Sequence, residues 1–172
     1  RILPLAKALE EHGIESEVIM PIAWNSIARG KLGNVLFATA TYRLGKCVET
    51  VVKSPDVVII GRSSNLQAYL LARILRRKNV KIIFDLDDAL FLPVGSLFGV
   101  KVRPGSFFLE KIFKNVDYIT VSSHYLLYYV KIFNHKASII HTPIDIELFN
   151  PNIKRKNVNN KITIGWEGNP RA

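Results

Sequence analysis

The feature that most constrains the fold is a series of short, continuous runs rich in valine and isoleucine, separated by longer amphipathic stretches. The apolar runs fall at 57–60, 80–84, 118–121 and 138–141. Strands that are apolar on both faces are typical of parallel sheets covered by helices, because both faces must be shielded from water. The alternation therefore predicts an α/β domain, a doubly wound parallel sheet with helices on both faces.

The spacing of apolar residues predicts helices between these runs. An amphipathic helix at the start of the chain ends near Gly13, a favourable C-terminal cap. Further helices are predicted at 36–53, from a Ser63 or Ser64 cap to about 78, at 106–114, and from a Ser122 or Ser123 cap to about 133. A short strand is expected at 14–20, and loops at 21–35 and 92–105.

The domain organisation follows from where the pattern stops and restarts. Residues 1–149 carry the predicted domain, and the polar stretch 150–160 is typical of a linker. Residues 161–172, KITIGWEGNPRA, begin a new strand followed by a glycine loop. We therefore expect a second domain to begin at 161, a first strand to precede Arg1, and the protein to continue at both ends.

The net charge of +10, from 24 Lys and Arg against 14 Asp and Glu, favours anionic partners such as phosphates or an anionic membrane face. Nucleic acid is not expected, because no stacking aromatic motif is interleaved with the basic residues. Cys47 is the single cysteine, which excludes an internal disulfide and fits a reducing cytoplasm. No apolar run reaches the roughly 18 residues of a membrane span.

An acidic cluster follows the central apolar run, in KIIFDLDDALF at 81–91. Asp85, Asp87 and Asp88 stand at the predicted carboxyl end of a strand, where open parallel sheets bind ligands. Carboxylates at the border of a core need a partner or a function. The cluster is therefore the first candidate for a binding or catalytic site.

One interpretation is a phosphatase, since FDLDDAL resembles the first motif of the haloacid-dehalogenase superfamily. The resemblance implies Asp85 as nucleophile, Asp87 as general acid and base, and Mg²⁺ to offset the crowded charge. The sequence departs from that family at Ala89, where a threonine is expected, and at least two strands precede the motif. A second alternative is a non-enzymatic α/β binding or receiver-like module, but no lysine ends the run SIIHTP.

A second resemblance covers nearly the whole chain in order. RILPLAKALEEHG, SPDVVIIGRSS, KIIFDLDDALF, DYITVSSHYL, SIIHTPIDIELFNP and KITIGWEGNP resemble successive segments of a GT-B glycosyltransferase of the retaining family 4. The resemblance implies a Rossmann-like N-terminal, acceptor-side domain. It also implies transfer of a sugar from a nucleotide-sugar to an acceptor in an interdomain cleft. The chain alone is then expected to be inactive.

The resemblance also implies roles for individual residues. Asp87 matches a position facing the cleft and is the expected catalytic contact, flanked by Asp85 and Asp88. Arg62 is expected to bind a phosphate or an acidic acceptor, while Ser63, Ser122 and His124 are expected to contact substrate. Gly165, Gly168 and Asn169 are expected to approach the donor diphosphate through backbone amides. No metal ligands and no cofactor besides the nucleotide-sugar are expected.

Apolar residues among the glycines of 92–105, with Phe107, suggest a lipid-linked or sugar acceptor and a peripheral membrane contact. The expected location is the cytoplasm, at the inner face of the membrane. The expected partners are the nucleotide-sugar, the acceptor and the chain's own second domain.

Overall fold

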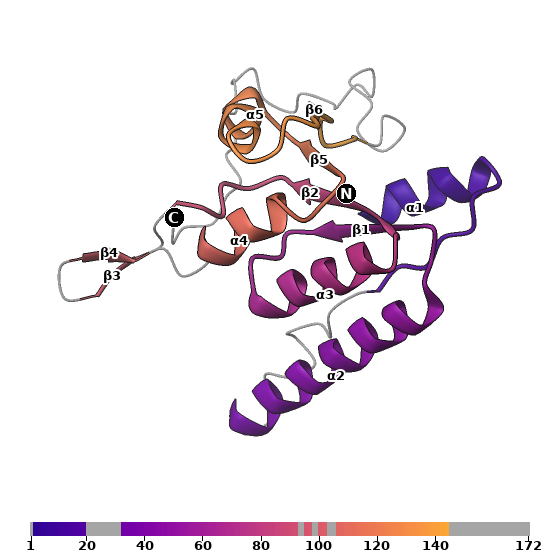
Figure 1. Cartoon of the computed structure of the whole chain (residues 1–172), viewed down its shortest axis with the longest axis horizontal. Coiled ribbons are helices and arrows are strands. Elements are labelled where there is room, and N and C mark those ends of the chain that lie inside the picture. Colours follow the sequence, from indigo (N-terminus) through magenta and orange to yellow (C-terminus); the bar gives the residue numbers. More distant parts are fainter. Residues whose placement is uncertain (1, 20–31, 93–94, 98–99, 103–105, 145–172) are drawn as a thin grey trace, which may run out of the picture.

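The computed structural model of the chain describes residues 2–19, 32–92, 95–97, 100–102 and 106–144. The expected linker at 150–160, the predicted second-domain start at 161–172 and most of the predicted loop at 21–35 lie outside these residues. The described part forms a sheet with helices packed alongside it (Figure 1). The structure is therefore an α/β fold, as the alternation of apolar runs predicts.

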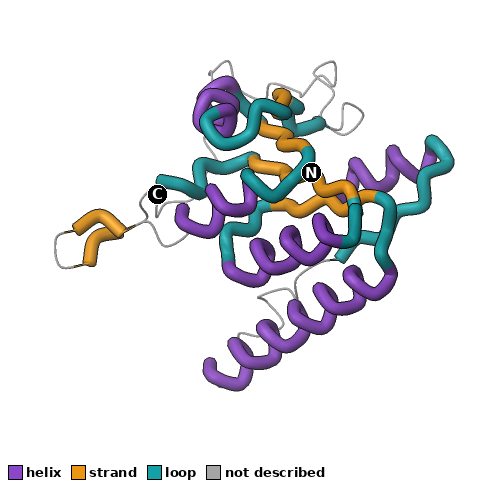
Figure 2. The backbone as a smooth tube through the Cα atoms, viewed as in Figure 1, coloured by secondary structure: helices purple, strands orange, loops and turns teal. Residues whose placement is uncertain are grey.

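The main sheet has four parallel strands. They are β1 (Val57–Gly61), β2 (Lys81–Leu86), β5 (Tyr118–Val121) and β6 (Ala137–Ile139), in the order β1-β2-β5-β6. All four were predicted from their apolar runs, with the last one displaced by one or two residues. Figure 2 shows these strands side by side, with the connecting helices running beside them.

Three helices connect these strands and cover one face of the sheet. They are α3 (Leu66–Arg77), α4 (Ser106–Phe113) and α5 (His124–Lys131). Each of these connections leads to the next strand in the sheet, always in the same direction. Because such crossovers between parallel strands are right-handed, connections that all run in one direction place their helices on the same face. Alternate residues of β2, namely Ile82, Phe84 and Leu86, are fully buried and share a single core cluster with all three helices.

The opposite face of the sheet is more open among the described residues. Ile59, Ile83 and Tyr118 are neighbours on it across three strands. Ile59 is 37% exposed and Tyr118 is 38% exposed. The parallel sheet with helices is thus confirmed, while the second helical layer of a doubly wound fold stays a prediction.

Two helices precede the sheet. The helix α1 (Ile2–Glu11) is followed by Gly13, whose φ of 76° is the left-handed value expected just beyond a helix end. The helix α2 (Leu32–Lys53) begins earlier than predicted and packs against α3 (Figure 1). Among the described helices, none is long and apolar enough to cross a membrane.

Three local predictions are wrong. Residues 14–19 form no strand. They pair with no strand of the described sheet, and the segment includes two exposed charged residues, Glu15 and Glu17. The N-cap of α3 is Asn65 rather than Ser63 or Ser64, and its side chain accepts the amide of Ala68. Part of the expected loop at 92–105 is an antiparallel hairpin, β3 (Gly95–Leu97) with β4 (Val100–Val102). Figure 1 shows this hairpin projecting away from the sheet.

Candidate functional site

The acidic cluster lies at the carboxyl edge of the parallel sheet, as predicted. The last residue of β1, Gly61, is paired with Asp85 near the end of β2. The amide of Arg62 continues this pairing by donating to the carbonyl of Asp85, with a nitrogen–oxygen distance of 3.2 Å. This register brings Arg62 beside the acidic run, although 26 residues separate Arg62 from Asp88 in sequence.

Arg62 forms ion pairs with two of the three carboxylates. Its Nε lies 3.3 Å from Asp87 Oδ1, and its terminal nitrogen donates to Asp88 Oδ2. The backbone of Arg62 has a φ of 48°, in the left-handed region that non-glycine residues seldom adopt. Backbone strain of this kind is found preferentially at binding and catalytic sites, where the surrounding structure holds it in place.

Asp87 has one carboxylate oxygen that lacks a hydrogen bond. Its Oδ1 is buried and has no hydrogen-bond partner among the described residues, although Arg62 Nε lies 3.3 Å away. The Arg62 guanidinium is close enough to Oδ1 for an ion pair, but the geometry is not that of a hydrogen bond. The side chain as a whole is 22% exposed, so Asp87 is screened from solvent without being sealed.

Two neighbours hold the backbone of the acidic run in place. Ser122, which follows β5, donates its hydroxyl to the carbonyl of Asp87 at 2.9 Å. Phe91 is 5% exposed and stacks on Tyr129 of α5, with ring centroids 3.6 Å apart. Together these contacts fix the chain on both sides of Asp88, so the carboxylates project from an ordered turn.

Asp85 serves a different purpose from its two neighbours. It is 8% exposed, and its Oδ1 accepts a hydrogen bond of 2.6 Å from the Thr120 hydroxyl. Asp85 and Thr120 are directly paired in the β2–β5 register. Thr120 was missed in the sequence, because its position opposite Asp85 depends on the strand order and register, which no local pattern indicates.

The remaining predicted site residues are less closely joined to the cluster. Ser63 follows Arg62 at the same edge, and His124 is exposed at the first position of α5. In the part of the chain that the structure describes, no hydrogen bond or ion pair links either of them to the carboxylates. The predicted donor-phosphate residues Gly165, Gly168 and Asn169 lie outside the described residues.

The chemistry of the site follows from its charges. Arg62, Asp87 and Asp88 carry one positive and two negative charges, so the triplet has a formal charge of −1. Carboxylates already paired with a guanidinium still accept hydrogen bonds on their remaining lone pairs. Over the described residues, no group of three His, Cys, Asp or Glu side chains is arranged as a metal site. The arrangement suits hydrogen-bond donors such as sugar hydroxyls.

Comparison with known proteins adds no relative: no family model, no curated protein and no solved structure matches the chain.

Proposed function

We propose that the chain is the acceptor-side domain of a GT-B glycosyltransferase, built on a Rossmann-like doubly wound sheet. The observation that carries the proposal is the Arg62–Asp87–Asp88 triplet at the carboxyl edge, where parallel α/β sheets bind ligands. The order of segments that resemble this family supports it. The transferred sugar would come from a nucleotide-sugar.

Asp87 is the proposed contact to the reacting hydroxyl of the acceptor. Its buried Oδ1 is ion-paired with Arg62 but has no hydrogen bond among the described residues, so a hydroxyl admitted beside it would supply that hydrogen bond. Arg62 offsets the carboxylate charge and fixes its direction. Its guanidinium is engaged by two carboxylates, so a phosphate contact by Arg62 would require at least one ion pair to break.

The geometry gives less support to the phosphatase alternative. That chemistry requires the first carboxylate of the motif to attack phosphorus. Asp85 is 8% exposed and its Oδ1 is held by Thr120, so it is neither open to a substrate nor free to move. The contacts of Asp85 are those of a structural acid that joins β2 to β5.

The membrane contact belongs to the same proposal. Phe107 in α4 is 59% exposed, and Lys111 Nζ lies 3.8 Å from its ring centroid. An exposed aromatic ring beside a cation is typical of residues that insert at a lipid–water interface. A lipid-linked acceptor at the cytoplasmic face of a membrane would fit this surface.

The experiment is a sugar-transfer assay on the protein in its full natural length. A panel of labelled nucleotide-sugars is incubated with lipid and glycan acceptors, and product is separated by mass. We expect transfer from one donor and a loss of at least about 100-fold in Asp87→Asn, as is usual when a transition-state contact is removed. Asp56→Asn, an exposed change beyond the site, is the matched control.

Transfer that survives Asp87→Asn unchanged would reject the role of Asp87. Failure of every donor, together with Mg²⁺-dependent hydrolysis of p-nitrophenyl phosphate that Asp85→Asn abolishes, would reject the transferase in favour of the phosphatase.

A further inference from the structure

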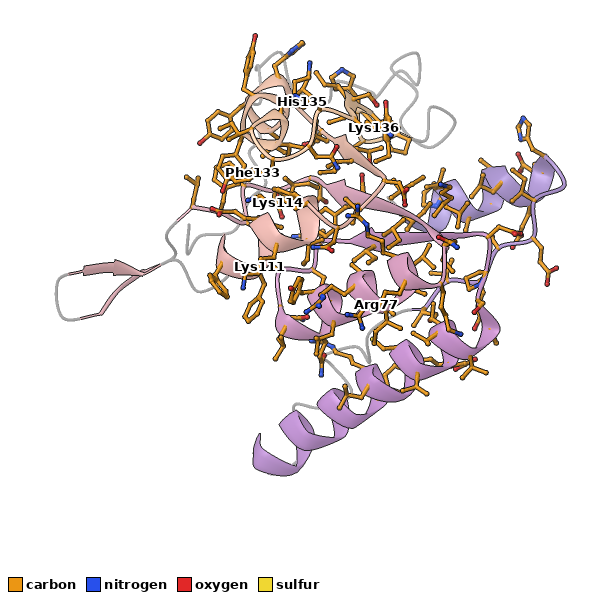
Figure 3. The ribbon with its side chains drawn as sticks, in the orientation of Figure 1. Arg77, Lys111, Lys114, Phe133, His135 and Lys136 are labelled. Atoms are coloured by element: carbon orange, nitrogen blue, oxygen red, sulfur yellow. The ribbon has the colours of Figure 1, made fainter. Side chains whose placement is uncertain are left out.

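A basic cavity lies at the opposite edge of the sheet from the acidic cluster. It has a volume of about 370 Å³ and is formed where α4 leads into β5 and α5 leads into β6, with the end of α3 beside them. Arg76, Lys114, His135 and Lys136 line it. Figure 3 shows Lys114, Phe133, His135 and Lys136 around these two connections.

Hydrogen bonds join the segments that line the cavity. The Asn134 side chain donates to the carbonyls of Phe113 and Val116 at 3.0 and 3.1 Å, and its oxygen accepts the amide of Lys136 at 2.9 Å. One nitrogen of Arg76 donates to the carbonyl of Lys114 at 2.8 Å, which ties α3 to the same place. Because these contacts already exist, a ligand would not have to order the site.

The positive charge of the cavity is not neutralised from within. The one acidic side chain in its lining, Asp117, accepts the amide of Ile82 at 2.9 Å and lies 3.6 Å from Lys81 outside the lining. In the part of the chain that the structure describes, neither Lys136 Nζ nor the His135 ring has a hydrogen bond or an ion pair. Lys114 Nζ lies 5.7 Å from the centroid of the Phe133 ring and has no ion pair with any described residue.

Basic residues at helix ends can also serve the helix dipole. Arg76 in the last turn of α3 and Lys114 just beyond α4 fit that role. The dipole does not explain His135 and Lys136, which lie in the α5–β6 connection beyond the last turn of α5. The helix dipole also does not require a cavity between the charges whose lining segments are hydrogen-bonded to one another.

We propose that this cavity binds a phosphate group. Arg76 supplies further guanidinium donors, Lys114 and Lys136 supply ammonium donors, and the volume suits a small phosphate ester. The ligand is either a soluble phosphate ester or the headgroup of an anionic phospholipid. The site is separate from the proposed sugar site, since the two lie at opposite ends of the strands.

The first test titrates inorganic phosphate and pyrophosphate into the chain at constant ionic strength, with binding followed through amide chemical shifts. We expect saturable shifts at residues 114–117 and 133–136. The double variant Lys114→Gln/Lys136→Gln should bind about tenfold more weakly or worse, since each substitution removes a charged hydrogen-bond donor. Lys114→Arg/Lys136→Arg should bind as the parent does. Lys7→Gln/Arg43→Gln removes the same charge from exposed positions on α1 and α2 and should bind within about twofold of the parent.

The second test separates the two sources of phosphate. The chain is sedimented with vesicles of phosphatidylcholine alone or with phosphatidylglycerol added. Vesicle binding that needs phosphatidylglycerol, is displaced by pyrophosphate and is lost in the double glutamine variant supports a lipid headgroup. Phosphate binding without vesicle binding supports a soluble ester. Absence of saturable phosphate binding, or equal weakening in Lys7→Gln/Arg43→Gln, would overturn the site.

Discussion

At the scale of single residues, Arg62 combines a left-handed backbone with two ion pairs, and substitutions can separate these effects. Arg62→Ala removes both ion pairs and keeps the unfavourable backbone, so we expect a loss of about 1 kcal/mol in unfolding free energy. Arg62→Gly removes the same pairs and relieves the backbone, so it should be about 1 kcal/mol more stable than Arg62→Ala. Urea unfolding measures both, and equal stabilities would contradict the left-handed conformation.

The structural role given to Asp85 is tested through its partner. Thr120→Val keeps the shape of the side chain but removes the hydroxyl that donates to Asp85 at 2.6 Å. Since Asp85 is buried, we expect a loss of about 1–3 kcal/mol in unfolding free energy. Thr120→Ser retains the hydroxyl and is the control. A valine variant as stable as the parent would show that the hydrogen bond does not hold Asp85.

The sequence predicts where the carboxylates stand but not what they contact. Asp85, Asp87 and Asp88 follow an apolar run, and that alone places them at a strand end. The pairing of Arg62 with Asp87 depends on the register between β1 and β2 and on an unusual φ at Arg62. The partner of Asp85 is 35 residues away in sequence. Contacts of this kind are set by tertiary packing, which local patterns do not encode.

At the scale of elements, α2 is tied to the segment before it by alternating charges. Glu49 lies 2.7 Å from Lys46 Nζ and 2.9 Å from Lys53 Nζ, and Lys53 reaches Glu17 at 2.7 Å. The hydrogen bond from Lys46, and to a smaller extent the one from Lys53, lowers the pKa of Glu49 from 4.5 to about 2. Within this network, the Lys53–Glu17 ion pair links α2 to residues 14–19, where a strand was expected.

The network predicts a pH dependence of stability. Because the folded pKa of Glu49 is lowered, its contribution is fully present above pH 4.5 and is lost as the pH falls toward 2. The stability difference between the parent and Glu49→Gln should therefore shrink across that window. Urea unfolding of both proteins at pH 7, 4.5 and 2.5 measures it. A difference that stays constant with pH would contradict the ion pairs.

The helices were predictable because each carries a periodic apolar pattern over many residues, and the central strands because each is a short continuous apolar run between them. The errors fall on short elements. The strands β3 and β4 have three residues each and are too short to show an alternation, and the glycines at 95, 99 and 105 are typical of a loop. The cap of α3 was misplaced because Ser63, Ser64 and Asn65 are all good caps, and only the backbone geometry distinguishes them.

At the scale of the whole molecule, the described core lies on one face of the sheet. Phe84 is fully buried on that face and meets the Phe113 ring edge-on at 5.6 Å, whereas Ile59 on the other face is 37% exposed. We expect Phe84→Ala to cost about 3–5 kcal/mol in unfolding free energy and Ile59→Ala about 1–2 kcal/mol. Thermal and urea unfolding measure both. Equal losses would contradict a one-sided core and would favour the second helical layer.

The two edges of the sheet carry opposite chemistry. The carboxyl edge presents the Arg62–Asp87–Asp88 triplet with a formal charge of −1, and the amino edge presents the basic cavity around Lys114 and Lys136. The carboxyl edge would bind the hydroxyls of a sugar acceptor. If that acceptor carried a phosphate, the negative triplet would repel the phosphate. Part of the net charge of +10 therefore lies at the amino edge, around the basic cavity.

We propose that the carboxyl edge beside Asp87 binds a sugar. The most direct measurement maps amide shifts of the labelled chain during titration with methyl glucoside, methyl mannoside, methyl galactoside and N-acetylglucosamine. We expect saturable shifts confined to residues 61–63, 87–89 and 122–124 for at least one sugar, and we expect them to be lost in Asp87→Asn. Shifts that appear only at the amino edge, or none with any of the four sugars, would contradict it.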